Sequence, residues 1–342
     1  MRRYLIILFF IMSACLLQAQ DLHFTQFYAA PLQLNPAHTG FFQEDYRVGG
    51  NFKQQWPWAR DNRMSNYRSL SVYGDMAMLR KKLPSKDWMG MGLVFFNDNA
   101  GDGNLSVNKA GLSFAYHKVM GHNDQVILSM GVGIRFIQKR IDYTALYFDS
   151  QWQDIAFDTD LPNQEANATE AIIYPDLNAG LRLTIRVNEY LSTHIGLGMT
   201  HLNRPRESFY GMANRLGMRP AIHAGVDYQI SRSLHIEPGF FYSYQKKAQE
   251  GVASLLMGFH PQADGFLRES VFFIGAAYRT KDALVPQAGY QYKRFKLIAN
   301  YDVNLSKLRE VSYGVGGFEI SMVYLGLRPS TLSKLRVPCP RL

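Results

Sequence analysis

The sequence predicts an all-β protein, a transmembrane antiparallel β-barrel of about 14 strands. Apolar and polar residues alternate with a period of two along most of the chain after residue 45. The N-terminus has the layout of an export signal, and no later stretch approaches the 18 consecutive apolar residues of a membrane helix. An exported chain without a membrane helix is either soluble or a barrel, and the enrichment in Gly (28), Tyr (20) and Phe (22) favours membrane strands.

Residues 1–19 are predicted to be a secretory signal peptide. A positively charged start, an apolar run over Tyr4–Met12 and small residues up to Ala19 form its three regions. The apolar run is too short to cross a bilayer as a helix. Cleavage after Ala19 makes Gln20 the first mature residue. A second interpretation is a lipoprotein signal with an acylated Cys15, although the apolar region resumes directly after that cysteine.

The clearest predicted strand lies within residues 175–187. Its odd positions, from Leu177 to Val187, are almost all aliphatic, whereas its even positions carry Asp176, Asn178 and Arg182. A lipid-facing row and a wet, lumen-facing row produce this pattern. The same reasoning predicts strands over 46–53, 67–79, 88–97, 104–117, 125–136, 175–187, 190–201, 220–230, 233–244, 252–258, 270–279, 285–292, 294–302 and 311–326.

Connection lengths predict the orientation of the barrel. Two odd-numbered connections, 137–174 and 202–219, are long, whereas most even-numbered ones are short turns. Outer-membrane barrels have short periplasmic turns and longer outside loops, so both ends of the barrel are predicted to face the periplasm. The expected organisation is a barrel over residues 46–326, an N-terminal plug segment over 20–45 at the periplasmic mouth, and a periplasmic tail over 327–342.

A soluble β-sandwich or propeller is the alternative fold. Sandwich strands usually span five to six residues, whereas several strands here are expected to exceed ten. A sandwich also rarely places Asp176, Arg182 and Arg186 on one row opposite aliphatic residues. The pattern and the export signal together favour the barrel and a location in the cell outer membrane.

The formal charge of +9 does not indicate nucleic-acid binding, because the chain is exported and carries no nucleic-acid motif. Anionic lipid headgroups or an acidic partner fit the compartment better. With only Cys15 and Cys339 in the chain, no internal disulfide is expected. Basic residues gather at the predicted periplasmic end and indicate either lipid contact or docking of a periplasmic partner: Arg80, Lys81, Lys82, Lys86, Arg232, Lys293, Arg294, Lys334, Arg336 and Arg341.

Catalysis and metal binding are not expected. Ser192 and His194 share a lumen row, and His201, His223 and His235 lie on neighbouring strands, but no nucleophile-elbow or H-E-x-x-H pattern occurs. No catalytic residue and no cofactor are predicted.

The long 137–174 connection is rich in acids and offers the one metal candidate. A surface calcium site is possible there, but without D-x-D-x-D-G spacing a solvated acidic loop is the favoured interpretation. Its acids are Asp142, Asp149, Asp154, Asp158, Asp160, Glu165 and Glu170.

The mature N-terminus, QDLHFTQFYAAPLQLNPAHTG over residues 20–40, resembles the start of the PorP/SprF family of Bacteroidota outer-membrane proteins. The family start is an exported Q-D-x-x-F-x-Q-(F/Y)-Y followed by L-N-P-A-x-(T/S)-G. Residues 45–47, 54–57, 175–180 and 318–321 are also similar to family segments. The chain ends in Cys339-Pro340-Arg341-Leu342, although members often end in Phe.

The resemblance implies a non-enzymatic outer-membrane component of type IX secretion and gliding motility. Family members are needed for secretion or surface display of particular cargo. Some act beside giant surface adhesins, and others sit with the periplasmic parts of the machine. The implied partners are outer-membrane lipids, type IX components in the periplasm and outer membrane, and a secreted cargo or surface adhesin.

The apolar side chains of the N-terminal segment are expected to be buried, either as a plug in the barrel or against a docked partner. Both alternatives remain open. The candidate docking and plug residues are Phe24, Gln26, Tyr28, Asn35, Pro36, Thr39, Gly40, Gln54 and Trp56. The candidate tail contacts are Arg336, Cys339 and Arg341. The rival function is a passive channel for a small solute, since a barrel of this size can enclose a lumen. An open lumen favours the channel, and a lumen filled by residues 20–45 favours docking.

Overall fold

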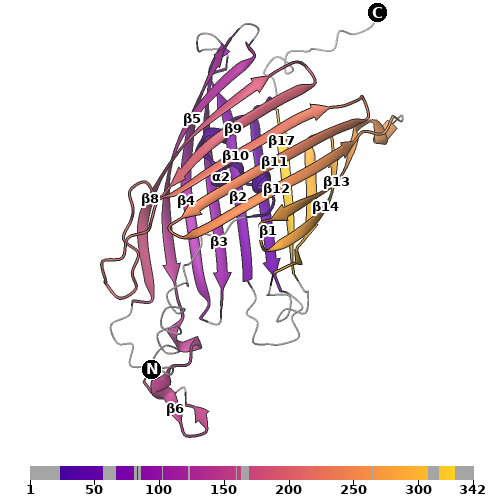
Figure 1. Cartoon of the computed structure of the whole chain (residues 1–342). Helices are drawn as coiled ribbons and strands as arrows, with labels where there is room; N and C mark the ends of the chain where they lie inside the picture. Colours follow the sequence, from indigo (N-terminus) through magenta and orange to yellow (C-terminus); the bar gives the residue numbers. More distant parts are fainter. Residues whose placement is uncertain are drawn as a thin grey trace, which may run out of the picture.

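The computed structural model describes residues 24–56, 67–80, 83, 86–101, 103–121, 124–158, 160–162, 169–262, 265–306 and 316–327. Within these ranges, 14 antiparallel strands close into a barrel (Figure 1). The strands are β1 (Tyr46–Gln55), β2 (Tyr67–Met78), β3 (Trp88–Ala100), β4 (Leu105–Met120), β5 (Val126–Arg140), β8 (Ala171–Arg186), β9 (Leu191–Thr200), β10 (Arg219–Gln229), β11 (Leu234–Gln245), β12 (Ala248–Phe259), β13 (Ser270–Arg279), β14 (Ala283–Tyr292), β15 (Phe295–Tyr301) and β17 (Gly317–Gly326). Pairing of β17 with β1 closes the ring, and β16 (Val303–Asn304) extends the contact of β15 with β14.

Exposure follows the predicted alternation. On β8, Leu177 and Leu181 are 42% and 48% exposed, whereas Asp176 and Asn178, on either side of Leu177, are 1% and 2% exposed. The aliphatic row therefore faces outward and the polar row faces the lumen, as expected for a strand that crosses a membrane. The prediction of a barrel of about 14 strands is confirmed.

The observed bounds differ from the predicted ones mainly at hairpins. The strands predicted over 252–258 and 285–292 begin earlier, at Ala248 and Ala283, because tight hairpins carry the ladder to the strand ends and pair Ala248 with Gln245 and Ala283 with Arg279. The strand predicted over 311–326 is seen as β17, and residues 311–315 lie outside the described residues.

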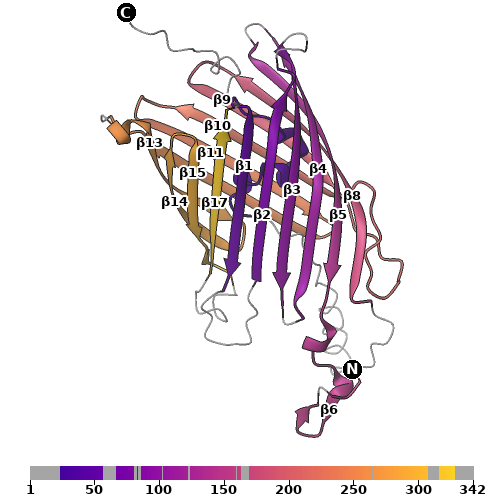
Figure 2. The ribbon, with the colours of Figure 1, turned by 180° about the vertical axis from the view of Figure 1, so that it is seen from behind.

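The two rims of the barrel differ. The near end is defined here as the rim where β1 begins and β17 ends, since Tyr46 pairs with Gly326. The far end carries the β5–β8 connection, with its small hairpin of β6 (Trp152–Gln153) and β7 (Ala156–Phe157). Seen from either side, this hairpin projects away from the strands, opposite the near end (Figures 1 and 2). That the near end faces the periplasm stays a prediction.

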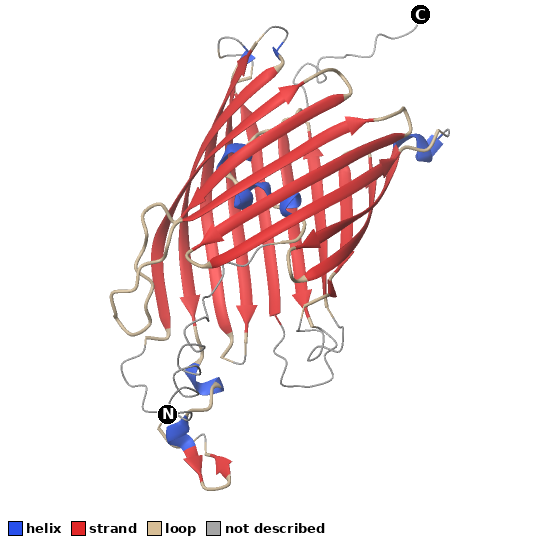
Figure 3. Cartoon of the chain, viewed as in Figure 1, coloured by secondary structure: helices blue, strands red, loops and turns tan. Residues whose placement is uncertain are grey.

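The described N-terminal residues lie inside the barrel, deeper than the periplasmic mouth at which the segment is predicted. Figure 3 shows its three short helices surrounded by strands: η2 (Phe27–Ala29), α2 (Pro31–Leu34) and η3 (Pro36–His38). The inward-facing side chains of the strands provide hydrogen-bond partners along much of the depth of the barrel. The segment makes these bonds as it runs inward from the near end. The other helices among the described residues are η6 (Tyr143–Ala145), η7 (Asp149–Gln151) and η8 (Gly265–Glu269). No helix among the described residues has the length and apolar character needed to span a bilayer.

Candidate functional site: the luminal segment

The luminal segment, defined as residues 24–42, folds into short turns because of its prolines. Pro31 occupies the first turn of α2, and Pro36 starts η3. Proline fits a first helical turn but disfavours the α region in the residue before it, which fits the extended conformation of Asn35. The Asn35 side chain accepts a hydrogen bond from the Ala37 amide at 2.8 Å and so caps η3.

The first anchor of the segment is the carboxylate of Glu319 on β17. The backbone amides of Thr25 and Gln26 donate to its two oxygens at 2.9 and 3.0 Å. The Gln26 side chain also contacts Ser321, one lumen position further along the same strand. Because all four residues are buried, these hydrogen bonds fix the backbone of the segment against the wall.

A charged network surrounds the first anchor. Arg279 donates to the Thr25 hydroxyl at 2.8 Å and to the Asp302 carboxylate at 2.9 Å. Lys53 lies 3.5 Å from the same carboxylate. Buried charges remain ionised only when they are paired, and this network provides two cations for Asp302 next to Glu319.

Apolar side chains of the segment fill the lumen beside this network. Phe27 stacks on Phe241, with 5.7 Å between ring centroids. Leu32 packs in a cluster with Tyr73, and the Tyr28 hydroxyl donates to Gln287 at 3.0 Å. Burial raises the pKa of Tyr28 well above its usual value, so the phenol stays a neutral donor. Apolar side chains of the segment and of the wall therefore pack together in the lumen.

The second anchor is the side chain of Asn35. Its amide nitrogen lies 3.0 and 3.1 Å from the backbone oxygens of Leu181 and Leu197, and 3.1 Å from Nε2 of His223. These partners lie on β8, β9 and β10. One neutral side chain thus joins three neighbouring strands of the wall.

Histidines extend the second anchor. Nε2 of His38 lies 3.3 Å from Nε2 of His223, so one ring donates and the other accepts. Burial lowers the pKa of His38 well below its usual value, with further contributions from Arg182, His223, His194 and Arg47. His38 is therefore neutral at pH 7, with one ring nitrogen that donates and one that accepts.

The segment turns toward the near end at Gly40, whose φ of +71° lies in the left-handed region that favours glycine. Its amide donates to Asp75 at 2.7 Å, and Trp88 donates to its carbonyl at 2.9 Å. Arg47 binds the same Asp75 carboxylate at 2.8 Å. A Cβ at position 40 would overlap the backbone of Gly90, so only glycine fits.

Three glycines bring the wall into contact with the segment. Gly131, Gly180 and Gly198 are paired across β5, β8 and β9. A side chain on Gly131 would overlap the Pro36 backbone, and one on Gly180 would overlap Asn35. We call these residues the glycine row.

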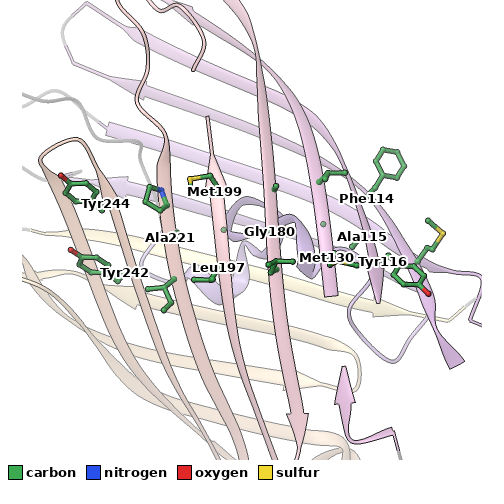
Figure 4. Close-up of a pocket in the computed structure, with 18 residues that line it drawn as sticks. Phe114, Ala115, Tyr116, Met130, Gly180, Leu197, Met199, Ala221, Tyr242 and Tyr244 are labelled. Atoms are coloured by element: carbon green, nitrogen blue, oxygen red, sulfur yellow. The ribbon is translucent and has the colours of Figure 1, made fainter. Parts of the chain in front are cut away.

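The outer surface of the barrel is hollowed over the glycine row. An apolar groove of about 850 Å³ crosses strands β3–β5 and β8–β11 on the outside, and all three glycines line it. Figure 4 shows Gly180 among the neighbouring strands, with a helix of the luminal segment behind it. The wall here has no side chain between the groove and the segment.

The structure brings most of the sequence-predicted docking and plug residues together in the lumen: Phe24, Gln26, Tyr28, Asn35, Pro36, Thr39 and Gly40. Gln54 and Trp56 do not join them. Gln54 pairs with Phe318 near the far end of β1, and Trp56 contacts Tyr67 just beyond it. The tail residues Arg336, Cys339 and Arg341 lie outside the described residues.

Three of the histidines considered for catalysis make separate contacts, and these contacts do not form a complete catalytic arrangement. His201 contacts Asp176 at 2.8 Å, His235 contacts His260 at 3.0 Å, and His223 contacts the luminal segment. In the described part of the chain, including much of the acidic 137–174 connection, no group of three His, Cys, Asp or Glu residues is placed to hold a metal ion.

Sequence reasoning missed the wall residues that hold the segment: Glu319, Arg279, Asp75, His223 and Gly180. Each lies on the lumen row of its strand, where polar residues are expected in any barrel, so none stands out alone. For Glu319, the available signal in the sequence was an acid between an aromatic and an aliphatic neighbour, in Phe318-Glu319-Ile320.

Solved structures share the barrel fold at low sequence identity. The CymD monoaromatic hydrocarbon channel has a TM-score of 0.50 and 12% identity, over 88% of this chain and 93% of that one. A TodX mutant channel has a TM-score of 0.51 and 10% identity, over 86% and 92%. The toluene transporter TbuX of Ralstonia pickettii has a TM-score of 0.49 and 12% identity, over 86% and 92%. At these identities the likeness concerns the fold.

None of the curated proteins matches this sequence. The family model described as "Type IX secretion system membrane protein PorP/SprF" matches residues 16–324, which include the luminal segment and nearly the whole barrel. This match and the closed barrel place the protein in the outer membrane. The chain therefore belongs to the PorP/SprF family of type IX secretion system membrane proteins.

Proposed function

We propose that this protein is a non-enzymatic docking or anchoring component of type IX secretion, which holds secreted cargo or a surface adhesin at the outer membrane. The observation that carries the proposal is the filled lumen. Residues 24–42 occupy the interior and are held by buried hydrogen bonds to several strands. A barrel closed in this way is suited to act through its surfaces rather than as an open pore.

The β6–β7 hairpin at the far end is the proposed docking surface for cargo. It presents apolar side chains to solvent: Tyr147 is 65% exposed, Trp152 49%, Ile155 89% and Phe157 45%. Phe157 contacts Trp152 and Tyr147, with ring centroids 4.9 and 5.2 Å apart. Exposed aromatic clusters mark interaction sites, and the nearby aspartates favour a partner with a basic rim.

Replacement of Trp152 and Ile155 by Ser tests this surface. We expect surface display of the cargo to fall strongly, because two central apolar contacts are lost. Display is measured by antibody labelling of intact cells, and heat-modifiable migration checks that the barrel is inserted. Tyr210→Ser, an exposed aromatic on another far-end loop, is the matched control. Normal display by the double variant would contradict the hairpin as the docking surface.

Contact with the periplasmic machinery is proposed for the near end. The described cations Arg80, Arg232 and Arg294 lie in near-end connections. The tail contacts Arg336, Cys339 and Arg341 remain part of the same proposal. Truncation after residue 326 is expected to leave an inserted barrel but to reduce cross-linking to periplasmic partners. Unchanged cross-linking would remove the tail from the proposal.

The second candidate is a passive channel for a small solute. It is favoured by the shared fold with CymD, which is itself a monoaromatic hydrocarbon channel. Planar-bilayer recordings separate the two functions. Docking predicts little steady current from the intact protein and a larger current after deletion of residues 20–42. A stable, large conductance of the intact protein would favour the channel.

A further inference from the structure

A groove at the near-end rim has the lining of a lipid-headgroup site. Its volume is about 840 Å³, and the residues that line it are His260, Arg268, Glu269, Val271, Tyr292, Lys293, Arg294, Phe295 and Tyr324. They come from η8 and from the near-end parts of β13, β14, β15 and β17, and His260 directly follows β12. The groove is separate from the luminal segment and from the β6–β7 hairpin.

The cations of this groove are unequally paired. Lys293 lies 3.2 Å from the carboxylate of Glu269, so its charge is balanced. Among the described residues, the guanidinium groups of Arg268 and Arg294 have no acidic partner, and both are exposed. Two free guanidinium groups beside one groove favour an anion with several acceptor oxygens, since each presents a fork of donors.

Aromatic residues place the groove at the level of the lipid headgroups. Phe295 is paired with Tyr324 across β15 and β17, and both are more than 40% exposed on the outward face. Tyr292 lies at the end of β14 beside them. Aromatic girdles of outer-membrane barrels lie at the interface between hydrocarbon and headgroups. A ligand of this groove therefore has an apolar part against the aromatic rings and an anionic part against the arginines.

We propose that the near-end groove binds the phosphate headgroup of an anionic glycerophospholipid, with Arg268 and Arg294 as its ligands and Phe295 and Tyr324 against its glycerol and upper acyl carbons. The near end is predicted to face the periplasm, and the inner leaflet on that side supplies such lipids. Glu269 keeps Lys293 from adding a third free charge. The proposal does not depend on the docking function.

The test is lipid binding by the full-length protein in detergent, measured by native mass spectrometry. Phosphatidylglycerol is titrated against phosphatidylcholine, lipid A and inorganic phosphate. The double variant Arg268→Gln/Arg294→Gln is compared with Arg186→Gln, an exposed arginine at the near-end terminus of β8 and outside the groove. Heat-modifiable migration confirms that each variant is folded.

We expect the wild-type protein and the Arg186→Gln variant to retain phosphatidylglycerol in preference to phosphatidylcholine. The double variant should lose about tenfold or more in affinity, because each arginine near a lipid surface contributes about 1 kcal/mol. Equal retention by the double variant and the wild type would overturn the site. Preferential binding of lipid A, or full competition by inorganic phosphate, would overturn the assignment to a glycerophospholipid.

Discussion

The two anchors of the luminal segment hold it by different physical means. At the first anchor, Thr25 and Gln26 donate to the buried carboxyl group of Glu319, beside the charged network of Arg279, Asp302 and Lys53. At the second anchor, Asn35 is held by neutral hydrogen bonds and by close contact with the glycine row. The first anchor depends on the acceptor oxygens of a buried carboxyl group and on the charges beside it, whereas the second depends on neutral hydrogen bonds and on the absence of side chains from the wall. The comparison indicates that steric changes at the second anchor disturb the segment most.

Both anchors leave buried polar groups without hydrogen bonds, which lowers the stability of the seated segment. Among the described residues, the side-chain amides of Asn51 and Asn300 near the first anchor, and Nδ1 of His223 at the second, are buried without a hydrogen-bond partner. Each such group costs about 1–3 kcal/mol relative to a hydrated one. Release of the segment would let water reach these groups. The seated state is therefore less stable than its contacts alone suggest.

The largest effect is expected from Gly180→Leu. The new side chain would occupy the position of the Asn35 amide, so the segment cannot sit against β8. Overpacking typically costs about 1–3 kcal/mol, and the hydrogen bonds of Asn35 are lost as well. We expect a steady ionic current in planar bilayers where the wild type shows little.

Gly74→Leu is the control for this substitution, because a Cβ at Gly74 has no neighbour closer than 3.8 Å. The control should conduct like the wild type. A closed Gly180→Leu barrel would mean that shape does not hold the second anchor.

A smaller effect is expected from Glu319→Gln. The carboxamide keeps the size of the side chain but has one acceptor oxygen, so it can accept from only one of the two amides of Thr25 and Gln26. Loss of a hydrogen bond to a charged group costs about 1.5–3 kcal/mol. Intermittent current is expected, with Glu207→Gln in a far-end loop as the control. A current larger than that of Gly180→Leu would reverse the ranking of the two anchors.

The smallest effect is expected from pH. The pKa of His38 is lowered in the seated segment, so the released segment takes up a proton more readily. Seating is fully stable above the unperturbed pKa of about 6.5 and weakens as pH falls below it, by up to about 1.4 kcal/mol per pH unit. Current recorded from pH 7.5 to 5 should rise toward the acid end. His38→Gln should show a flatter profile, and an equally steep one would assign the titration to another buried group of the lumen, His194, His223 or Glu319.

The barrel was predictable because alternation is a local signal. Each predicted strand could be identified from its own residues, as Leu177 and Asp176 illustrate on β8. The anchors were not predictable, because they form only when the ring closes. Glu319 and Thr25 are 294 positions apart, and nothing in either neighbourhood indicates the other. The apolar residues of the segment correctly indicated burial, but the polar partners that draw Gln26 and Asn35 into the lumen lie on strands far away in the sequence.

The glycine row also changes what separates the membrane from the lumen. Elsewhere, the thickness of the wall includes outward and inward side chains. Along Gly131, Gly180 and Gly198 it consists of peptide backbone alone, with the apolar groove outside and Asn35 and Pro36 inside. Lateral pressure from acyl chains in that groove acts directly on the strands that bind Asn35. The glycine row is thus a mechanical contact through which the state of the bilayer affects how the luminal segment is held in the lumen.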